Sequence, residues 1–145
     1  MADIRNTGVK MADMKCAAEV IYEGYLYMDD GSGRMTICAA ITDITIGIAA
    51  YNSLDCQTGA AKTMTAGDKH AFYLVGSGAI VGVMSEAVTW QFGDVAYLGT
   101  TNGSVQNVDA TTNMYIGHYI GKDAATATAG DLVQIVLDVP IGSTT

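Results

Sequence analysis

The sequence predicts an all-β fold, and three observations predict it. Short runs of β-branched and aromatic residues recur along the chain, glycine-rich turn signals separate them, and strand–helix alternation is absent. We expect about eight to ten short strands in a small β-barrel, a β-tulip or a sandwich, preceded by an extended N-terminal arm. The same pattern recurs within the chain, because a Gly-Asp pair precedes a predicted strand at residues 67–68, 93–94 and 130–131.

The length of 145 residues fits one domain with an arm, and it suffices to bury a core without disulfides or metal. Charged residues make up 15% of the chain, below the roughly 25% of ordinary soluble domains. Two interpretations remain open. Either alanine and glycine are simply abundant, or part of the surface is a large subunit interface. Strand tyrosines carry the same ambiguity, since they serve both in cores and at interfaces.

The net charge of −8 is unevenly distributed. Residues 1–15 carry three bases and two acids, whereas the remainder carries four bases and thirteen acids. An acidic body argues against nucleic acid and against anionic membrane surfaces as partners. The N-terminus lacks the apolar core of a signal peptide, and no apolar run reaches the roughly 20 residues that span a bilayer. Cys16, Cys38 and Cys56 lack metal-ligand spacing, so we expect free thiols made in a reducing compartment.

The first 19 residues show no clear period. We predict that residues 1–19 form an arm that orders on a partner, with a short docked helix as the alternative, and that residues 20–145 form the body. The arm supplies the candidate partner contacts. These are Ile4, Arg5, Val9, Lys10, Met14 and Lys15.

The body begins with strand-like runs at residues 20–22, 25–28 and 34–40. The sequence Asp29-Asp30-Gly31-Ser32-Gly33 between the last two predicts a hairpin turn, because aspartate and glycine tolerate positive φ. Residues 41–48 follow as a half-buried strand with Ile44, Ile46 and Ile48 on one face. The connection at residues 50–66 is long and polar, so it is either an interface element or a short helix around residues 59–62.

The second half repeats this texture. Residues 72–75 and 79–84 flank Gly-Ser-Gly, which predicts a hairpin, and residues 95–98 and 105–108 flank Thr-Asn-Gly-Ser, which predicts another. The last strands are expected at residues 115–120 and 132–139. Pro140 ends the set, because proline cannot donate to a ladder.

No catalytic or cofactor motif competes with this pattern, so we expect neither an enzyme nor a cofactor. Gly76-Ser77-Gly78 lacks the spacing of a nucleophile elbow. The acidic turn at residues 29–33 could hold calcium, but it fits no EF-hand loop and a plain turn is favoured. His70 beside Asp68 could act as a base, although a structural histidine at a strand start is the better interpretation.

The C-terminal half resembles that of tailed-phage capsid decoration proteins, also called cement proteins. In that family an I-G-x-A strand is followed by an alanine-rich loop, a Gly-Asp or Gly-Glu turn and a final V-x-V-x-L strand. The resemblance covers roughly residues 35–139 and includes copies near residues 46–49, 66–68 and 93–98. The matching run is Ile116-Gly117-His118-Tyr119-Ile120, Ala124-Ala125-Thr126-Ala127-Thr128-Ala129, Gly130-Asp131 and Leu132-Val133-Gln134-Ile135-Val136-Leu137.

The resemblance implies a small β-barrel or β-tulip protein, often trimeric, on the outside of an icosahedral head. Such a protein is synthesised in the host cytoplasm, binds where major capsid protein subunits meet, and reinforces the expanded shell. The alternative hypothesis is a β-sandwich module of a head fibre that binds a receptor or a glycan. Exposed aromatic side chains in a groove would favour that alternative.

Overall fold

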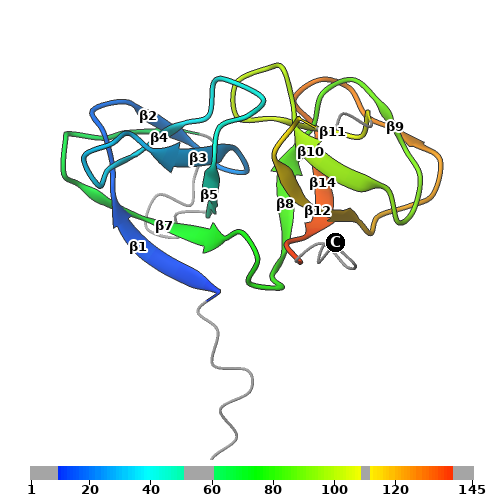
Figure 1. The fold of residues 1–145 in the computed structure, drawn as a ribbon, viewed down its shortest axis with the longest axis horizontal. Coiled ribbons are helices and arrows are strands. Elements are labelled where there is room, and N and C mark those ends of the chain that lie inside the picture. Colours follow the sequence, from blue (N-terminus) through cyan, green and yellow to red (C-terminus); the bar gives the residue numbers. More distant parts are fainter. Residues whose placement is uncertain (1–9, 51–60, 109–111, 139–145) are drawn as a thin grey trace, which may run out of the picture.

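The computed structural model describes residues 10–50, 61–108 and 112–138, which form two lobes side by side (Figure 1). The predicted all-β class is confirmed, and the described sheets form a sandwich-like arrangement in which none closes into a barrel. The strands of the first lobe are β1 (Met11–Lys15), β2 (Val20–Tyr22), β3 (Leu26–Asp29), β4 (Met35–Ile37), β5 (Thr45–Ala49), β6 (Ala61–Thr63) and β7 (Lys69–Leu74). Those of the second are β8 (Ile80–Met84), β9 (Thr89–Trp90), β10 (Val95–Leu98), β11 (Val105–Gln106), β12 (Tyr115–Tyr119), β13 (Ala125–Thr126) and β14 (Leu132–Val136).

The two lobes have the same topology. In the first, the five-stranded sheet has the order β1-β7-β5-β3-β4 and β2 pairs with β6. In the second, the order is β8-β14-β12-β10-β11 and β9 pairs with β13. Each strand of the first lobe therefore has its counterpart seven strands later. We call β1–β7 the first unit and β8–β14 the second unit, and the chain is a tandem duplication of one fold.

Individual hydrogen bonds repeat between the units. The amide of Cys16 donates to the carbonyl of Asp68 at 2.8 Å, and the amide of Ser85 donates to that of Asp131 at the same distance. Both units also carry a β-bulge at the same place. The register between β3 and β5 shifts after Tyr27, and the register between β10 and β12 shifts after Ala96.

Each unit has its own apolar core, and at two equivalent positions the large and the small side chain are interchanged between the two cores. Tyr27 on β3 accompanies Ala49 on β5 in the first unit, whereas Ala96 on β10 accompanies Tyr119 on β12 in the second. Tyr27 and Ala96 are completely buried, and the other two are nearly so. A core tolerates such an exchange when the total volume is kept. The two sequences therefore fill the same backbone with different side chains.

The predicted Gly-Asp turns are confirmed as one type of turn. At residues 65–68, 91–94 and 128–131 the aspartate amide donates to the carbonyl of the first turn residue at 2.9, 3.0 and 2.9 Å. The Oδ2 atoms of Asp68, Asp94 and Asp131 accept the amide of the same first residue at 3.0, 2.8 and 2.8 Å. Each glycine has a φ between 90° and 96°, which strongly favours glycine.

The units share one boundary. The amide of Met84 donates to the carbonyl of Gly24 at 2.8 Å, and the amide of Gly103 donates to that of Cys38 at 2.9 Å. Leu26, Cys38 and Ile48 of the first unit belong to the apolar core of the second. The units therefore pack as one body.

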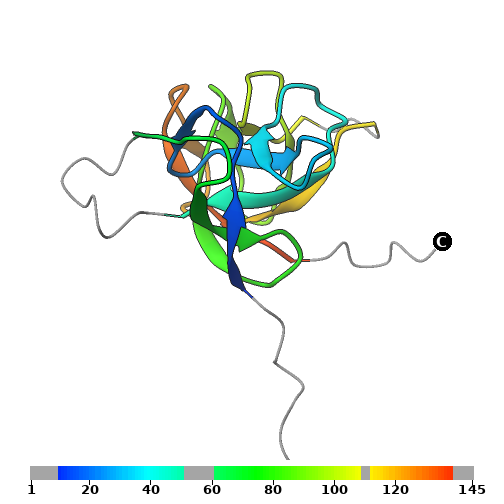
Figure 2. The same ribbon diagram turned by 90° about the vertical axis from the view of Figure 1, so that its left-hand side faces the viewer.

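The predicted arm boundary at residue 19 is wrong. Residues 11–15 form β1, which runs antiparallel alongside β7 (Figure 2). Cys16 is completely buried, and residues 20–22 form the next strand. The segment forms a half-buried strand because its alternate residues, Ala12 and Met14, face inward while its charged residues face solvent. It lies at the edge of the sheet, next to β7. Residues 1–9 lie outside the described residues.

Two other local predictions are wrong. The Gly76-Ser77-Gly78 turn joins no hairpin, because β7 pairs with β5 and β1 whereas β8 finds a five-residue partner in β14. The prediction that Ile44, Ile46 and Ile48 share one face of a strand is also wrong. Ile44 is 72% exposed and precedes β5. The bulge opposite β3 inserts residue 46 into β5, so Ile46 and Ile48 pack into different cores. By contrast, the hairpins at residues 29–33 and 101–104 are confirmed.

Candidate functional site

The outer face of β1 is the candidate partner-binding surface. Of the predicted contact residues, Lys10 and Lys15 are exposed, whereas Met14 packs against the first core. Ile4, Arg5 and Val9 lie outside the described residues. In the described part of the chain, β1 ends the sheet, with β7 on one side and no strand on the other. Such an edge presents backbone groups to which another chain can add.

A pair of lysines distinguishes this face from the rest of an acidic body. Lys15 on β1 lies directly opposite Lys69 on β7, and both side chains are exposed. Like charges directly opposite one another across two strands are destabilising. Asp13 lies two residues before Lys15 on the same exposed face and offsets part of this charge. A carboxylate on a partner would relieve the remaining repulsion between the lysines. The sequence could not assign Lys69 to this face, because the β1–β7 pairing is long-range.

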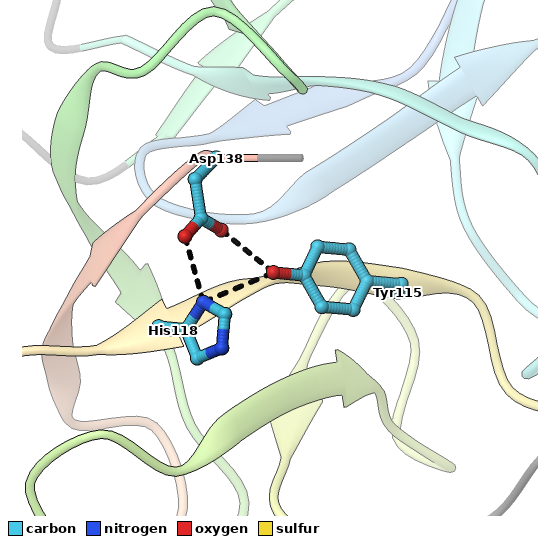
Figure 3. A network of polar contacts seen from close by, with 3 residues as sticks. All are labelled: Tyr115, His118 and Asp138. Carbon is cyan, nitrogen blue, oxygen red and sulfur yellow. Dashed lines mark hydrogen bonds and ion pairs between the residues drawn. The ribbon is translucent and has the colours of Figure 1, made fainter. Parts of the chain in front are cut away.

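A second polar cluster lies on β12 and at the end of β14 (Figure 3). The hydroxyl of Tyr115 donates to Asp138 Oδ1 at 2.7 Å, and His118 Nδ1 lies 2.7 Å from Asp138 Oδ2. The tyrosine oxygen is also 3.0 Å from His118 Nδ1. All three side chains are half-buried. Burial, followed by the hydrogen bond to Asp138 and its charge, raises the pKa of the Tyr115 phenol, so this group stays protonated and is no nucleophile at neutral pH.

Sequence reasoning missed this cluster for a specific reason. On a regular strand, residues 115 and 118 point to opposite faces. The bulge pairs Tyr97 with Tyr115 and Ala96 with Gly117, which skips Ile116 and brings both side chains to one face. The cluster links the start of β12 to the residues after β14. Its contacts account for it as a structural network.

The other predicted polar sites take structural roles. His70 Nε2 lies 2.9 Å from the carbonyl oxygen of Ala50, and its ring packs edge-on to Phe72 in the first core. No described contact brings it to His118. Asp29 Oδ1 accepts the amides of Gly31 and Gly33 at 3.0 and 2.9 Å, which agrees with a turn at residues 29–33. No group of three or more metal-ligating side chains occurs in the described part of the chain.

A cleft of about 840 Å³ lies between the two units. Tyr25 and Ile41 of the first unit line it together with Met84, Glu86 and residues near 100 and 130 of the second. Tyr25 is the one aromatic residue in the lining. The Glu86 carboxylate accepts hydrogen bonds from the amide and the hydroxyl of Thr100, at 2.8 and 2.7 Å. Among the described residues, this lining does not show the grouped aromatic side chains that would favour the glycan-binding hypothesis.

Cys16 and Cys38 are free and buried, in agreement with the expected free thiols, and Cys56 lies outside the described residues. Burial raises the pKa of both thiols to about 11, and nearby carboxylates add to the effect. In a Cys56→Ser variant we expect the folded protein to react with a thiol reagent at pH 8 on the order of a hundredfold more slowly than the urea-unfolded chain, since about one thiol in a thousand is ionised in the folded state and about one in ten in the unfolded state.

The pH dependence of stability follows with a defined sign. Between the ordinary thiol pKa of 9.0 and the raised pKa of about 11 the folded state holds more thiol protons than the unfolded state. Stability is therefore present below pH 9 and falls as the pH rises through this window. Labelling of the folded variant at the rate of the unfolded chain would contradict the burial of these thiols.

Comparisons with known proteins add no family. No protein-family model matches the chain, and no curated protein sequence matches it. Within residues 10–50, 61–108 and 112–138, no helical segment has the length and hydropathy needed to span a bilayer.

Proposed function

We propose that the chain is a virion structural protein that binds the outside of an icosahedral capsid and stabilises the shell, as a symmetric oligomer, with a trimer as the expected state. Its partner is the major capsid protein. The observation that carries the proposal is that the segments resembling decoration proteins are the segments on which both units are built. Gly47 and Gly117 occupy equivalent strands, and residues 67–68 and 130–131 form equivalent turns.

The β1 face supports this partner. A decoration protein acts through many weak contacts repeated by symmetry, so it needs adhesive edges rather than an active site. Here the edge strand β1 carries Lys15, and Lys10 directly precedes this strand, on a protein of net charge −8. We expect these residues, with the segment that precedes them, to contact an acidic surface of the capsid.

Co-sedimentation with expanded, undecorated heads of the virus that encodes the chain tests the proposal. We expect saturable pelleting near one copy per major capsid subunit. Reversing both charges in Lys10→Glu/Lys15→Glu should weaken binding about tenfold or more, which corresponds to roughly 1.4 kcal/mol. Lys122→Glu, an exposed change in the second unit, is the matched control and should bind as the unaltered protein does.

Two outcomes would count against this function. Absence of pelleting by the unaltered protein would reject capsid binding, and a receptor and glycan screen on the same sample would then test the head-fibre alternative. Equal weakening by the control would show that net charge, rather than the β1 face, governs the interaction.

A further inference from the structure

The contact between the two units is made by two different surfaces. Surface A is the part of the second unit that meets the first, and it includes Met84, Gly103 and Met114. Surface B is the part of the first unit that meets the second, and it includes Gly24, Leu26, Cys38 and Ile41. Because the units have one fold, a counterpart of surface A exists on the first unit and a counterpart of surface B on the second.

Strand positions identify the counterpart of surface A. Lys15 ends β1 as Met84 ends β8, and Ile44 precedes β5 as Met114 precedes β12. Gly33 matches Gly103, since both lie in the turn before the equivalent strand, with φ of 77° and 72°. These residues of the first unit form the free surface A.

The counterpart of surface B follows in the same way. Gly93 matches Gly24, with φ of 90° and 82°, and Val95 begins β10 as Leu26 begins β3. The parallel bridges of Cys16 with Met35 and of Ser85 with Val105 align β4 with β11, which places Val108 at the position of Cys38. His118 pairs with Val95 as Ile48 pairs with Leu26. These residues of the second unit form the free surface B.

The space beside the glycines is filled at the internal contact and open at the two free surfaces. A Cβ atom on Gly24 would lie 2.5 Å from Leu132 Cδ2, and one on Gly103 would lie 3.0 Å from Ile37 Cδ1. A Cβ atom on Gly93 or Gly33 would meet nothing within 4 Å.

Apolar side chains are exposed on both free surfaces. Val108, which also borders the cleft between the units, is 60% exposed, whereas Cys38 at the equivalent position is 1% exposed. Ile44 on the free surface A is 72% exposed. Each surface thus retains an apolar contact residue without the unit that would cover it.

We propose that copies of this chain associate head to tail, with the free surface A of one copy on the free surface B of the next. The contact repeats the one within the chain and is therefore heterologous, so it extends to a ring or a filament and does not stop at two subunits.

One pair of opposite charges meets across the two free surfaces. Within the chain, Met84 and Tyr25 line the same cleft at the unit boundary. Their counterparts are Lys15 and Asp94. Exposed Lys15 would thus approach Asp94 of the neighbouring copy. The association should weaken as salt is raised, because such pairs are screened.

The inference concerns how copies of the chain meet, and it does not require the capsid. Sedimentation velocity without capsids tests it with two variants at exposed positions, Ile44→Asp on the free surface A and Val108→Asp on the free surface B. At matched concentration, the association constant of each variant alone should be about tenfold or more below that of the unaltered protein. Ile80→Asp, also at a position 62% exposed but outside both surfaces, is the control.

Mixing the two variants gives the decisive result. The Val108→Asp copy retains an intact free surface A, and the Ile44→Asp copy retains an intact free surface B. The mixture should therefore form a one-to-one dimer and nothing larger. Circular dichroism checks the folding of each variant, and Ile44→Lys with Val108→Lys serves if an aspartate variant unfolds. A strictly monomeric unaltered protein, a dimer that never grows, or no recovery on mixing would each overturn the proposal, whatever the capsid experiment gives.

Discussion

Gly117→Ala is expected to cost more stability than any other single methyl group added to a strand of this protein. A Cβ atom at this position would lie only 2.0 Å from the carbonyl oxygen of Val136 on the neighbouring strand. Since backbone atoms of a paired strand cannot swing aside, β12 and β14 must separate. We expect a loss above the roughly 3 kcal/mol that overpacking usually costs, measured by urea unfolding.

The duplication supplies matched comparisons for this change. Gly47 occupies the equivalent position, but its Cβ atom would lie 2.9 Å from the carbonyl oxygen of Tyr73, so Gly47→Ala should cost less, about 1–3 kcal/mol. Gly82 in β8 would gain only ordinary contacts, at 3.5 Å or more, and Gly82→Ala should be neutral or stabilising. Equal effects of the changes at residues 117 and 82 would contradict the close approach of β12 and β14.

Trp90→Ala is the second large expected effect. Trp90 is completely buried, its ring stacks on Tyr119 at 5.2 Å, and its Nε1–H donates to Ser85 Oγ at 2.9 Å. Its removal leaves a cavity in the second core and takes away the donor to Ser85 Oγ, which still donates to the carbonyl of Glu86 at 2.7 Å. We expect a loss of about 3–5 kcal/mol in unfolding free energy, followed by far-UV circular dichroism because the chain has one tryptophan.

A conservative change separates packing from hydrogen bonding at this site. Trp90→Phe keeps an aromatic ring against Tyr119 but removes the donor to Ser85, so it should cost less than the alanine variant and leave the fold intact. A loss below about 1 kcal/mol for the alanine variant would mean that the second core does not depend on this side chain.

Local chemistry made part of this fold predictable. The Gly-Asp turns were predictable because glycine is favoured by the positive φ and the aspartate carboxylate closes on an amide three residues earlier. The turn at residues 29–33 followed for the same reason. The recurrence of the turn before residues 69 and 132 was the visible trace of the duplication.

Pairing between distant strands was not predictable from the same signals. The short period-two pattern of residues 11–15 gave no sign that β7 is their partner, so these residues were assigned to an arm. A bulge changes which side chains share a face, and this concealed both the burial of Thr45 and the meeting of Tyr115 with His118. Lys10 and Lys15 are exposed, and their contact with a partner stays a prediction, while the place of Lys69 opposite Lys15 required the sheet.

Amide hydrogen exchange tests the central claim most directly, which is that β1 belongs to the body and that the two units are equivalent. The amides of Cys16, Gly67 and Ala49 should exchange slowly together with their counterparts at Ser85, Gly130 and Tyr119, because each makes the equivalent backbone hydrogen bond. Protection confined to the second unit, with the amide of Cys16 exchanging at the rate of an unfolded chain, would contradict the account.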